Sequence, residues 1–171
     1  MIYLNIGSNL HSKFGNRLDN INKSIILLSN LDINIIKISS IYETPSYPDE
    51  SNPKFLNICI KINTNLTAEL LLFKVKLIEN EIGRIKKIDN EPRVCDIDII
   101  DFKGFSYKNN KLNLPHPRLH LRNFVLYPLR EINPNWIHPI SKQNVDNLIN
   151  QLSLQSRKEI TRIDKSAIIK P

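Results

Sequence analysis

Glycine and cysteine are scarce in this chain, which has only four glycines and two cysteines in 171 residues. Neither Cys59 nor Cys95 belongs to a Cys-x-x-Cys pair, so we expect reduced, buried thiols rather than disulfides or a zinc site. The glycine-rich G-x-G-x-x-G and G-x-x-x-x-G-K-[ST] fingerprints are both missing. If the protein binds a nucleotide, it therefore uses neither a Rossmann turn nor a P-loop.

Long apolar runs are also lacking, since none approaches the roughly 20 residues of a membrane helix. The first residues are typical of a strand rather than of a signal peptide. We therefore expect a cytoplasmic protein with no membrane partner. The formal net charge of +7 is compatible with a polyanionic substrate or with nucleic acid. Lys/Arg-rich blocks with interleaved aromatic residues do not occur, which disfavours nucleic acid.

The pattern of apolar residues predicts one domain over residues 1–157, followed by a basic C-terminal tail, 158–171, that frays. Helical spacing predicts a helix over 13–29 capped by Ser12 and another between Thr67 and Gly83. A short helix is expected over 122–131, with Pro128 near its end or at a kink, and a last one around 145–152. Strands are expected at 2–6, 33–44, 55–62, 93–99 and 105–107. This order favours an α+β fold, with a ferredoxin-like, antiparallel-containing sheet and packed helices in a three-layer sandwich.

Asp96 and Asp98 are two residues apart in an apolar, β-branched run, Arg93–Ile99. A strand has a side-chain period of two, so both carboxylates would lie on one face, with Cα atoms roughly 6–7 Å apart. Such a pair needs a positive partner, and Mg²⁺ commonly bridges carboxylates to phosphate. A bare Asp-x-Asp can equally be two solvated charges, so the neighbouring residues decide between these interpretations.

Basic residues flank the aspartate pair on both sides. Arginine binds phosphate oxygens in bidentate fashion, so these residues together are typical of a polyphosphate cradle: Arg84, Arg93, His116, Arg118 and Arg122. Glu79 lies beside the apolar stripe of its helix, and by itself it would form a solvated surface pair with Arg84.

A second group combines aromatic rings with an amide. Rings for stacking and polar groups for the edge suit a flat heterocycle, and the residues concerned are Thr44, Pro45, Tyr47, Phe55, Asn57 and Phe124. Phe55 and Phe124 could instead be core residues. Asn57 interrupts an apolar strand, and a buried amide requires partners.

These segments, taken in order, resemble one family. They are Gly7-Ser8-Asn9-Leu10, Ser39 to Pro45, Phe55-Leu56-Asn57, Ile78-Glu79 through Gly83-Arg84, Pro92-Arg93 with Asp96-Ile97-Asp98, and Pro115-His116-Pro117-Arg118 with Arg122, Phe124, Val125 and Leu126. The set is similar to 6-hydroxymethyl-7,8-dihydropterin pyrophosphokinase over residues 2 to about 134.

The resemblance implies a ferredoxin-like monomer that transfers pyrophosphate from ATP to the hydroxymethyl group of a dihydropterin and releases AMP, in folate biosynthesis. It implies two Mg²⁺ ions on Asp96 and Asp98, with Arg84 and Arg93 also catalytic. ATP contacts would be Glu79, Arg84, Arg93, His116 and Arg122. The pterin pocket would be Thr44, Pro45, Tyr47, Phe55, Asn57 and Phe124.

The loop from Lys86 to Glu91 departs from the family pattern. It lacks the Trp-Gly pair of well-known members and is one residue shorter, and Lys86 stands where arginine is common. Asn90 and Glu91 cannot stack on a pterin, so closure over the substrates would need other contacts. Two alternatives stay open: a metal-dependent nucleotidyltransferase, which releases pyrophosphate, and a non-enzymatic basic RNA-binding module.

Overall fold

The protein is built around a sheet of six strands within the residues that the computed structural model describes, which are 1–47, 49–84, 91–163 and 168. Its main path runs β5-β1-β4-β3-β8, and β2 also pairs with β4. The strands are β1 (Ile2–Ser8), β2 (Asn34–Ile38), β3 (Ile41–Thr44), β4 (Phe55–Asn63), β5 (Asp96–Phe102) and β8 (Thr161–Ile163). Every pairing is antiparallel, so the predicted α+β fold is confirmed.

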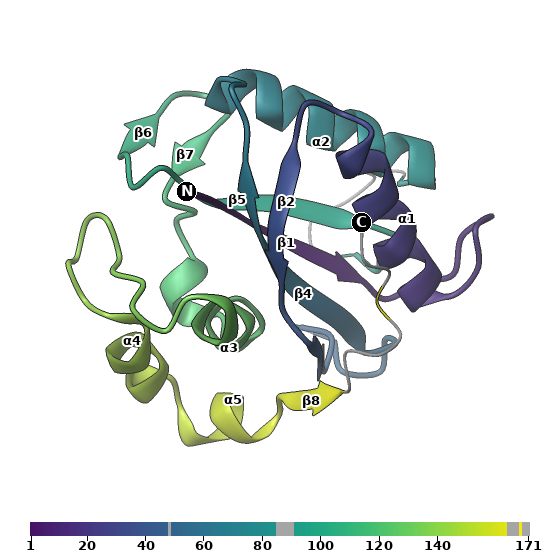
Figure 1. Cartoon of the computed structure of the whole chain (residues 1–171). Coiled ribbons are helices and arrows are strands. Elements are labelled where there is room, and N and C mark those ends of the chain that lie inside the picture. Colours follow the sequence, from purple (N-terminus) through teal and green to yellow (C-terminus); the bar gives the residue numbers. More distant parts are fainter. Residues whose placement is uncertain (48, 85–90, 164–167, 169–171) are drawn as a thin grey trace.

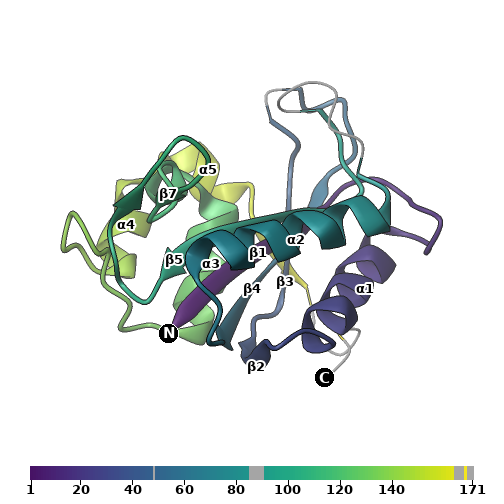
Figure 2. The same cartoon turned by 90° about the horizontal axis from the view of Figure 1, so that it is seen from above.

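Helices cover both faces of this sheet (Figures 1 and 2). On one face lie α1 (Arg17–Ser29) and α2 (Ala68–Ile82), over strand residues such as Leu4, Ile58 and Ile97. On the other lies α3 (Asn123–Ile132), followed by α4 (Val145–Gln151) and α5 (Leu154–Lys158). Because strand side chains alternate, this second face is built from the residues between those of the first.

Helix ends show where local sequence chemistry works as predicted and where it does not. α2 begins after the Thr67 cap and ends at Gly83, whose φ of 107° is left-handed. The Ser12 cap was wrong, because α1 is capped by Asn16 in a capping box with Asp19. Ser12 instead donates to the side chain of Asn20, 2.5 Å away.

The predicted strand 33–44 is two strands separated by a break at Ser39 and Ser40. The backbone nitrogen of Ser40 donates to the Glu131 carboxylate on α3 rather than to a strand. The predicted strand 105–107 is shifted, since β6 spans Tyr107–Lys108 and pairs with β7 (Asn113–Leu114). A short 3-10 helix (Leu119–Leu121) precedes α3, which contains Pro128.

Two parts of the predicted tail are described, residues 158–163 and residue 168. Thr161–Ile163 form β8, which pairs with β3, and Ile168 is buried in the core on the α1/α2 face. The domain limit at residue 157 itself stays a prediction. Cys59 and Cys95 are free and buried, as expected. Among the described helices, none is long and apolar enough to cross a membrane.

Candidate active site

A line of directly opposed residues crosses the whole sheet from β5 to β8. Asp96 pairs with Gly7, Gly7 with Asn57, Asn57 with Tyr42, and Tyr42 with Arg162. Opposed residues of antiparallel strands project from the same face, which here is the face that α3 covers. We call these five residues the polar row. Asp98, two residues after Asp96, is opposite Asn5 on the same face, as the strand period predicts.

Asp96 is held by two arginines. Its Oδ1 lies 2.5 Å from Nη1 of Arg84, and its Oδ2 lies 2.8 Å from Nη1 of Arg93. Burial alone would raise the pKa of this carboxyl group, but the charges of Arg93 and Arg84 outweigh it and lower the pKa below the ordinary value. Asp96 is therefore ionised at neutral pH, as a cation ligand must be.

Asp98 has a separate set of basic neighbours. Its Oδ2 lies 3.3 Å from Nη1 of Arg122 and 3.9 Å from Nε2 of His116. Burial lowers the pKa of His116, against the opposing charge of Asp98, so the ring is neutral at pH 7. Its Nδ1 accepts the backbone N–H of Arg118, so the ring proton belongs on Nε2, which faces Asp98.

Glu79 is not the solvated surface residue that its helix position indicated, because it is 2% exposed. Its Oε1 accepts the backbone N–H of Ile97 at 2.7 Å and lies 2.5 Å from Nη1 of Arg84 and 2.8 Å from Nζ of Lys76. Burial raises its pKa, against the charges of Lys76 and Arg84. The carboxylate thus joins α2 to β5 and fixes the guanidinium that reaches Asp96.

The two predicted phenylalanines each carry an arginine on the ring. The Arg93 guanidinium carbon lies 5.6 Å from the Phe55 ring centroid, and that of Arg122 lies 5.3 Å from the Phe124 centroid. Both rings are half-buried, so neither is a simple core residue. Arg93 Nε is buried and has no hydrogen-bond partner within the described part of the chain.

The amide of Asn57 is buried between β3 and β1. Its Nδ2 donates to Oγ1 of Thr44 at 3.3 Å, while a Cβ at Gly7 would lie 2.9 Å from its Oδ1. Glycine at position 7 therefore keeps the space between Asp96 and Asn57 open. Pro45 is half-buried, and Tyr47, the remaining predicted pterin residue, is 85% exposed. This structure does not bring Tyr47 together with the others.

Asn9 was not among the predicted site residues, although its motif was noted. Its Oδ1 accepts the backbone N–H of Arg93 at 2.7 Å, and its Nδ2 donates to the Pro53 carbonyl at 3.0 Å. The buried amide thus joins the loop after β1 to the segments before β4 and β5. The sequence offered one signal for this role: Asn9 is a polar residue directly after a strand, in the short segment between Gly7 and the first helix.

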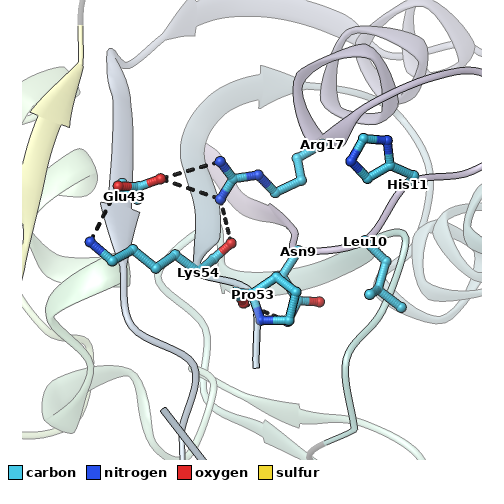
Figure 3. Close-up of a pocket in the computed structure, with 7 residues that line it drawn as sticks. All are labelled: Asn9, Leu10, His11, Arg17, Glu43, Pro53 and Lys54. Atoms are coloured by element: carbon cyan, nitrogen blue, oxygen red, sulfur yellow. Dashed lines mark hydrogen bonds and ion pairs between the residues drawn. The ribbon is translucent and has the colours of Figure 1, made fainter. Parts of the chain in front are cut away.

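A hollow of about 380 Å³ lies beside Asn9 (Figure 3). In it, Glu43 is 3.3 Å from Arg17 and 3.7 Å from Lys54, so one carboxylate is shared by two cations. None of the described residues that line it is a predicted site residue. Glu43 is adjacent to Tyr42 on β3 and therefore projects from the opposite face, so this hollow is separate from the aspartates.

The carboxylates fit a magnesium site that the substrate completes. No group of three or more His, Cys, Asp or Glu that could hold a metal occurs among the described residues. Mg²⁺ needs no such cage, because it is usually bound by one or two carboxylates, substrate phosphates and water. Asp96 and Asp98 match the carboxylate part of that donor set. The altered loop from Lys86 to Asn90 lies outside the described residues; Glu91 is half-buried.

A family model, 7,8-dihydro-6-hydroxymethylpterin-pyrophosphokinase, matches residues 3–134. The chain belongs to this family. An Aquifex aeolicus 2-amino-4-hydroxy-6-hydroxymethyldihydropteridine pyrophosphokinase is 40% identical over 142 residues, covering 83% of this chain and 86% of the relative. A Bacillus subtilis protein of the same name is 37% identical and covers 76% of each chain. The family resemblance derived from the motifs is therefore confirmed.

Longer proteins contain the same unit. The chain is 39% identical to the Pneumocystis carinii folic acid synthesis protein fol1, matching 82% of this chain but only 18% of that protein. It also resembles the solved wild-type HPPK-DHPS of Plasmodium falciparum, with a TM-score of 0.72 and 17% identity over 95% of this chain and 48% of that one. At that identity the structural match shows the pyrophosphokinase fold.

Proposed function

We propose that this protein transfers pyrophosphate from ATP to the hydroxymethyl group of 6-hydroxymethyl-7,8-dihydropterin and releases AMP, as a step of folate biosynthesis. The observation that supports it best is the pairing of two carboxylates on one strand with three arginines from three different segments: Arg84 with Asp96, Arg93 with Asp96, and Arg122 with Asp98. We further propose a cytoplasmic monomer that binds neither nucleic acid nor a membrane.

We assign the residues on and beside the polar row from Asp96 to Asn57 to the two substrates. Asp96, Asp98 and the basic residues around them (Arg84, Arg93, His116 and Arg122) form a charged end that suits the triphosphate of ATP. Asn57 and Thr44, with the rings of Phe55 and Phe124, form an uncharged end that suits a pterin. We place Pro45 and Tyr47 at the same pocket, with Tyr47 moving inward when the pterin binds. Gly7 lies between the two ends.

In the free protein, arginines and carboxylates neutralise each other. A triphosphate would take over the guanidinium groups of Arg84, Arg93 and Arg122, since they bind phosphate oxygens bidentately. Asp96 and Asp98 would then be available to hold two Mg²⁺ ions, which when bound would supply charge neutralisation along the phosphate chain. Glu79 would keep Arg84 in place during this exchange through its ion pair and its bond to Ile97.

Phosphoryl-type transfer depends mainly on alignment and electrostatic stabilisation. Arg84 and Arg93 approach Asp96 from just after α2 and from the segment before β5, so both can face the transferred group. Neutral His116, with its proton on Nε2, can donate to a phosphate oxygen. The Arg93 Nε proton, which has no partner among the described residues, is a further donor for substrate.

The released product tests this proposal. Purified protein with ATP, Mg²⁺ and 6-hydroxymethyl-7,8-dihydropterin should form AMP and the pterin pyrophosphate in equal amounts, as chromatography can measure. Release of inorganic pyrophosphate would show attack at the α-phosphorus and a nucleotidyltransferase. Release of ADP, or no turnover, would also overturn the proposal. Salt-dependent binding of RNA without pterin binding would favour the RNA-binding module.

A further inference from the structure

A half-buried carboxylate of α3 binds β3 and the residue before it, next to the polar row. Glu131 accepts the backbone N–H of Ser40 at 3.0 Å from each of its oxygens, the Ser40 hydroxyl at 2.9 Å, and the Tyr42 hydroxyl at 2.9 Å. Arg162 of β8 adds a bond from Nε to Ser40 Oγ at 3.1 Å, and its Nη2 lies 3.5 Å from Glu131. We call these four residues the Glu131 tether.

The tether connects the two sides of the proposed pterin pocket. Phe124 and Glu131 both lie on α3, two helical turns apart, because seven residues make about two turns. Tyr42 is directly opposite Asn57, and Thr44 follows on the same face of β3. The tether thus fixes α3, which carries Phe124, relative to β3 and β4, which carry Thr44 and Asn57.

The two tether residues at β3 are buried, so water competes little for their hydrogen bonds to Glu131. Ser40 is 1% exposed and Tyr42 is 7% exposed. Burial, followed by the hydrogen bond to Glu131 and then its charge, raises the pKa of Tyr42, so its hydroxyl remains a donor at neutral pH. A carboxylate that accepts several donors at once cannot move with one element and leave the other behind.

We propose that Glu131 is a positioning residue that sets the spacing of the pterin pocket, with β8 completing the tether through Arg162. The inference rests on the proposed function. It also gives the C-terminal segment, which lies beyond the family match at residue 134, a part in substrate binding. A residue that only stabilised the fold would affect both substrates alike, whereas this one acts on the pterin alone.

Glu131→Gln tests the inference, because the amide keeps the shape but can no longer accept at every position. We expect the KM for the pterin to rise about tenfold, which corresponds to the free energy of one lost charge-assisted hydrogen bond. The KM for ATP should stay within about twofold and kcat within about threefold, since no bond to Asp96 or Asp98 changes. Steady-state kinetics, with pterin titrations in the presence of a non-hydrolysable ATP analogue, measure these effects.

The matched control is Asp146→Asn. Asp146 forms an exposed ion pair, 2.5 Å long, with Arg130, the residue before Glu131, and the substitution removes it. It should leave both KM values unchanged. Arg162→Gln and Tyr42→Phe should each raise the pterin KM about threefold. If they act through Glu131, combining either with Glu131→Gln should add less than their separate effects predict.

Several results would overturn the inference. If the wild-type enzyme releases AMP and Glu131→Gln has an unchanged KM for the pterin, the inference is wrong. The inference is also wrong if the variants lose affinity for the pterin and for ATP equally, in proportion to the fall in melting temperature. That result would indicate a purely structural role. If Glu131→Gln fails to fold, Tyr42→Phe, which removes a single hydroxyl, decides the question by the same KM comparison. A wild-type protein that neither binds the pterin nor releases AMP would overturn the proposed function first, and the inference with it.

Discussion

The two faces of the central sheet use the same strands for different purposes. Under α1 and α2, the strands present almost only isoleucine and leucine, for example Leu4, Ile58 and Ile97. Under α3, one end of the sheet is apolar, with Cys59 and Ile100 in a second core, and the other end carries the polar row. Since strand side chains alternate, neighbouring residues divide between stability and chemistry, and point substitutions can separate the two.

The largest expected effect is at the aspartates. Asp96→Asn and Asp98→Asn should each lower kcat by about 1,000-fold or more, because each removes a charge that would hold the metal on the triphosphate. The melting temperature should change little, since both side chains are partly exposed and Asn keeps their size. Quenched-flow or steady-state measurement of AMP release gives the rate. A variant that kept near-normal turnover would show that the metal assignment is wrong.

Asp101→Asn is the control on the same strand. Asp101 is 4% exposed and accepts the indole N–H of Trp136 at 2.8 Å and the backbone N–H of Gly104 at 2.9 Å. We expect it to lower the free energy of unfolding by about 1–3 kcal/mol, with kcat of the folded protein within about twofold. Equal kinetic losses in all three variants would mean that the strand, rather than its paired aspartates, is what matters.

Much of the fold and the site followed from the sequence because the signals were local. A period of two placed Asp96 and Asp98 on one face, and Thr67 and Gly83 set the limits of α2. What failed depended on distant partners. The sequence around Glu79 does not show that its carboxylate accepts the backbone N–H of Ile97. The sequence around Ser40 does not show that its backbone N–H donates to Glu131 rather than to a neighbouring strand.

Long-range pairing also explains the errors at the ends of elements. Ser12 has the chemistry of a helix cap, but its hydroxyl is used by Asn20, and Asn16 with Asp19 makes the better cap. The tail looks polar and basic, yet β8 gains backbone hydrogen bonds from the open edge of β3. A strand whose stability comes from an edge far away in the sequence has no pattern of its own to detect.

Asn57 and Ile58 are adjacent residues on opposite faces, so they provide the most direct comparison. Asn57→Ala should raise the pterin KM by about tenfold to 100-fold, since it would remove the edge contact to the heterocycle that we propose for Asn57. Ile58→Ala should instead cost about 2–5 kcal/mol of unfolding free energy and leave the KM values of the folded protein nearly unchanged. Denaturant melts and kinetics on both variants would show whether the faces are this independent. A large pterin defect in Ile58→Ala would contradict it.

The smallest expected effect is at Gly7, between Asp96 and Asn57 in the polar row. In Gly7→Ala the new Cβ would lie 2.9 Å from Asn57 Oδ1, so the amide must shift, but a side-chain end can do so at little cost in stability. We therefore expect about a threefold rise in the pterin KM and a change in unfolding free energy below about 1 kcal/mol. Gly104→Ala is the matched control, because its φ of 73° strains any other residue while nothing lies within 4 Å of the new Cβ. It should cost about 1 kcal/mol or more with unchanged kinetics. If Gly7→Ala instead changed only the stability, the space left by Gly7 would not be what sets the position of the Asn57 amide.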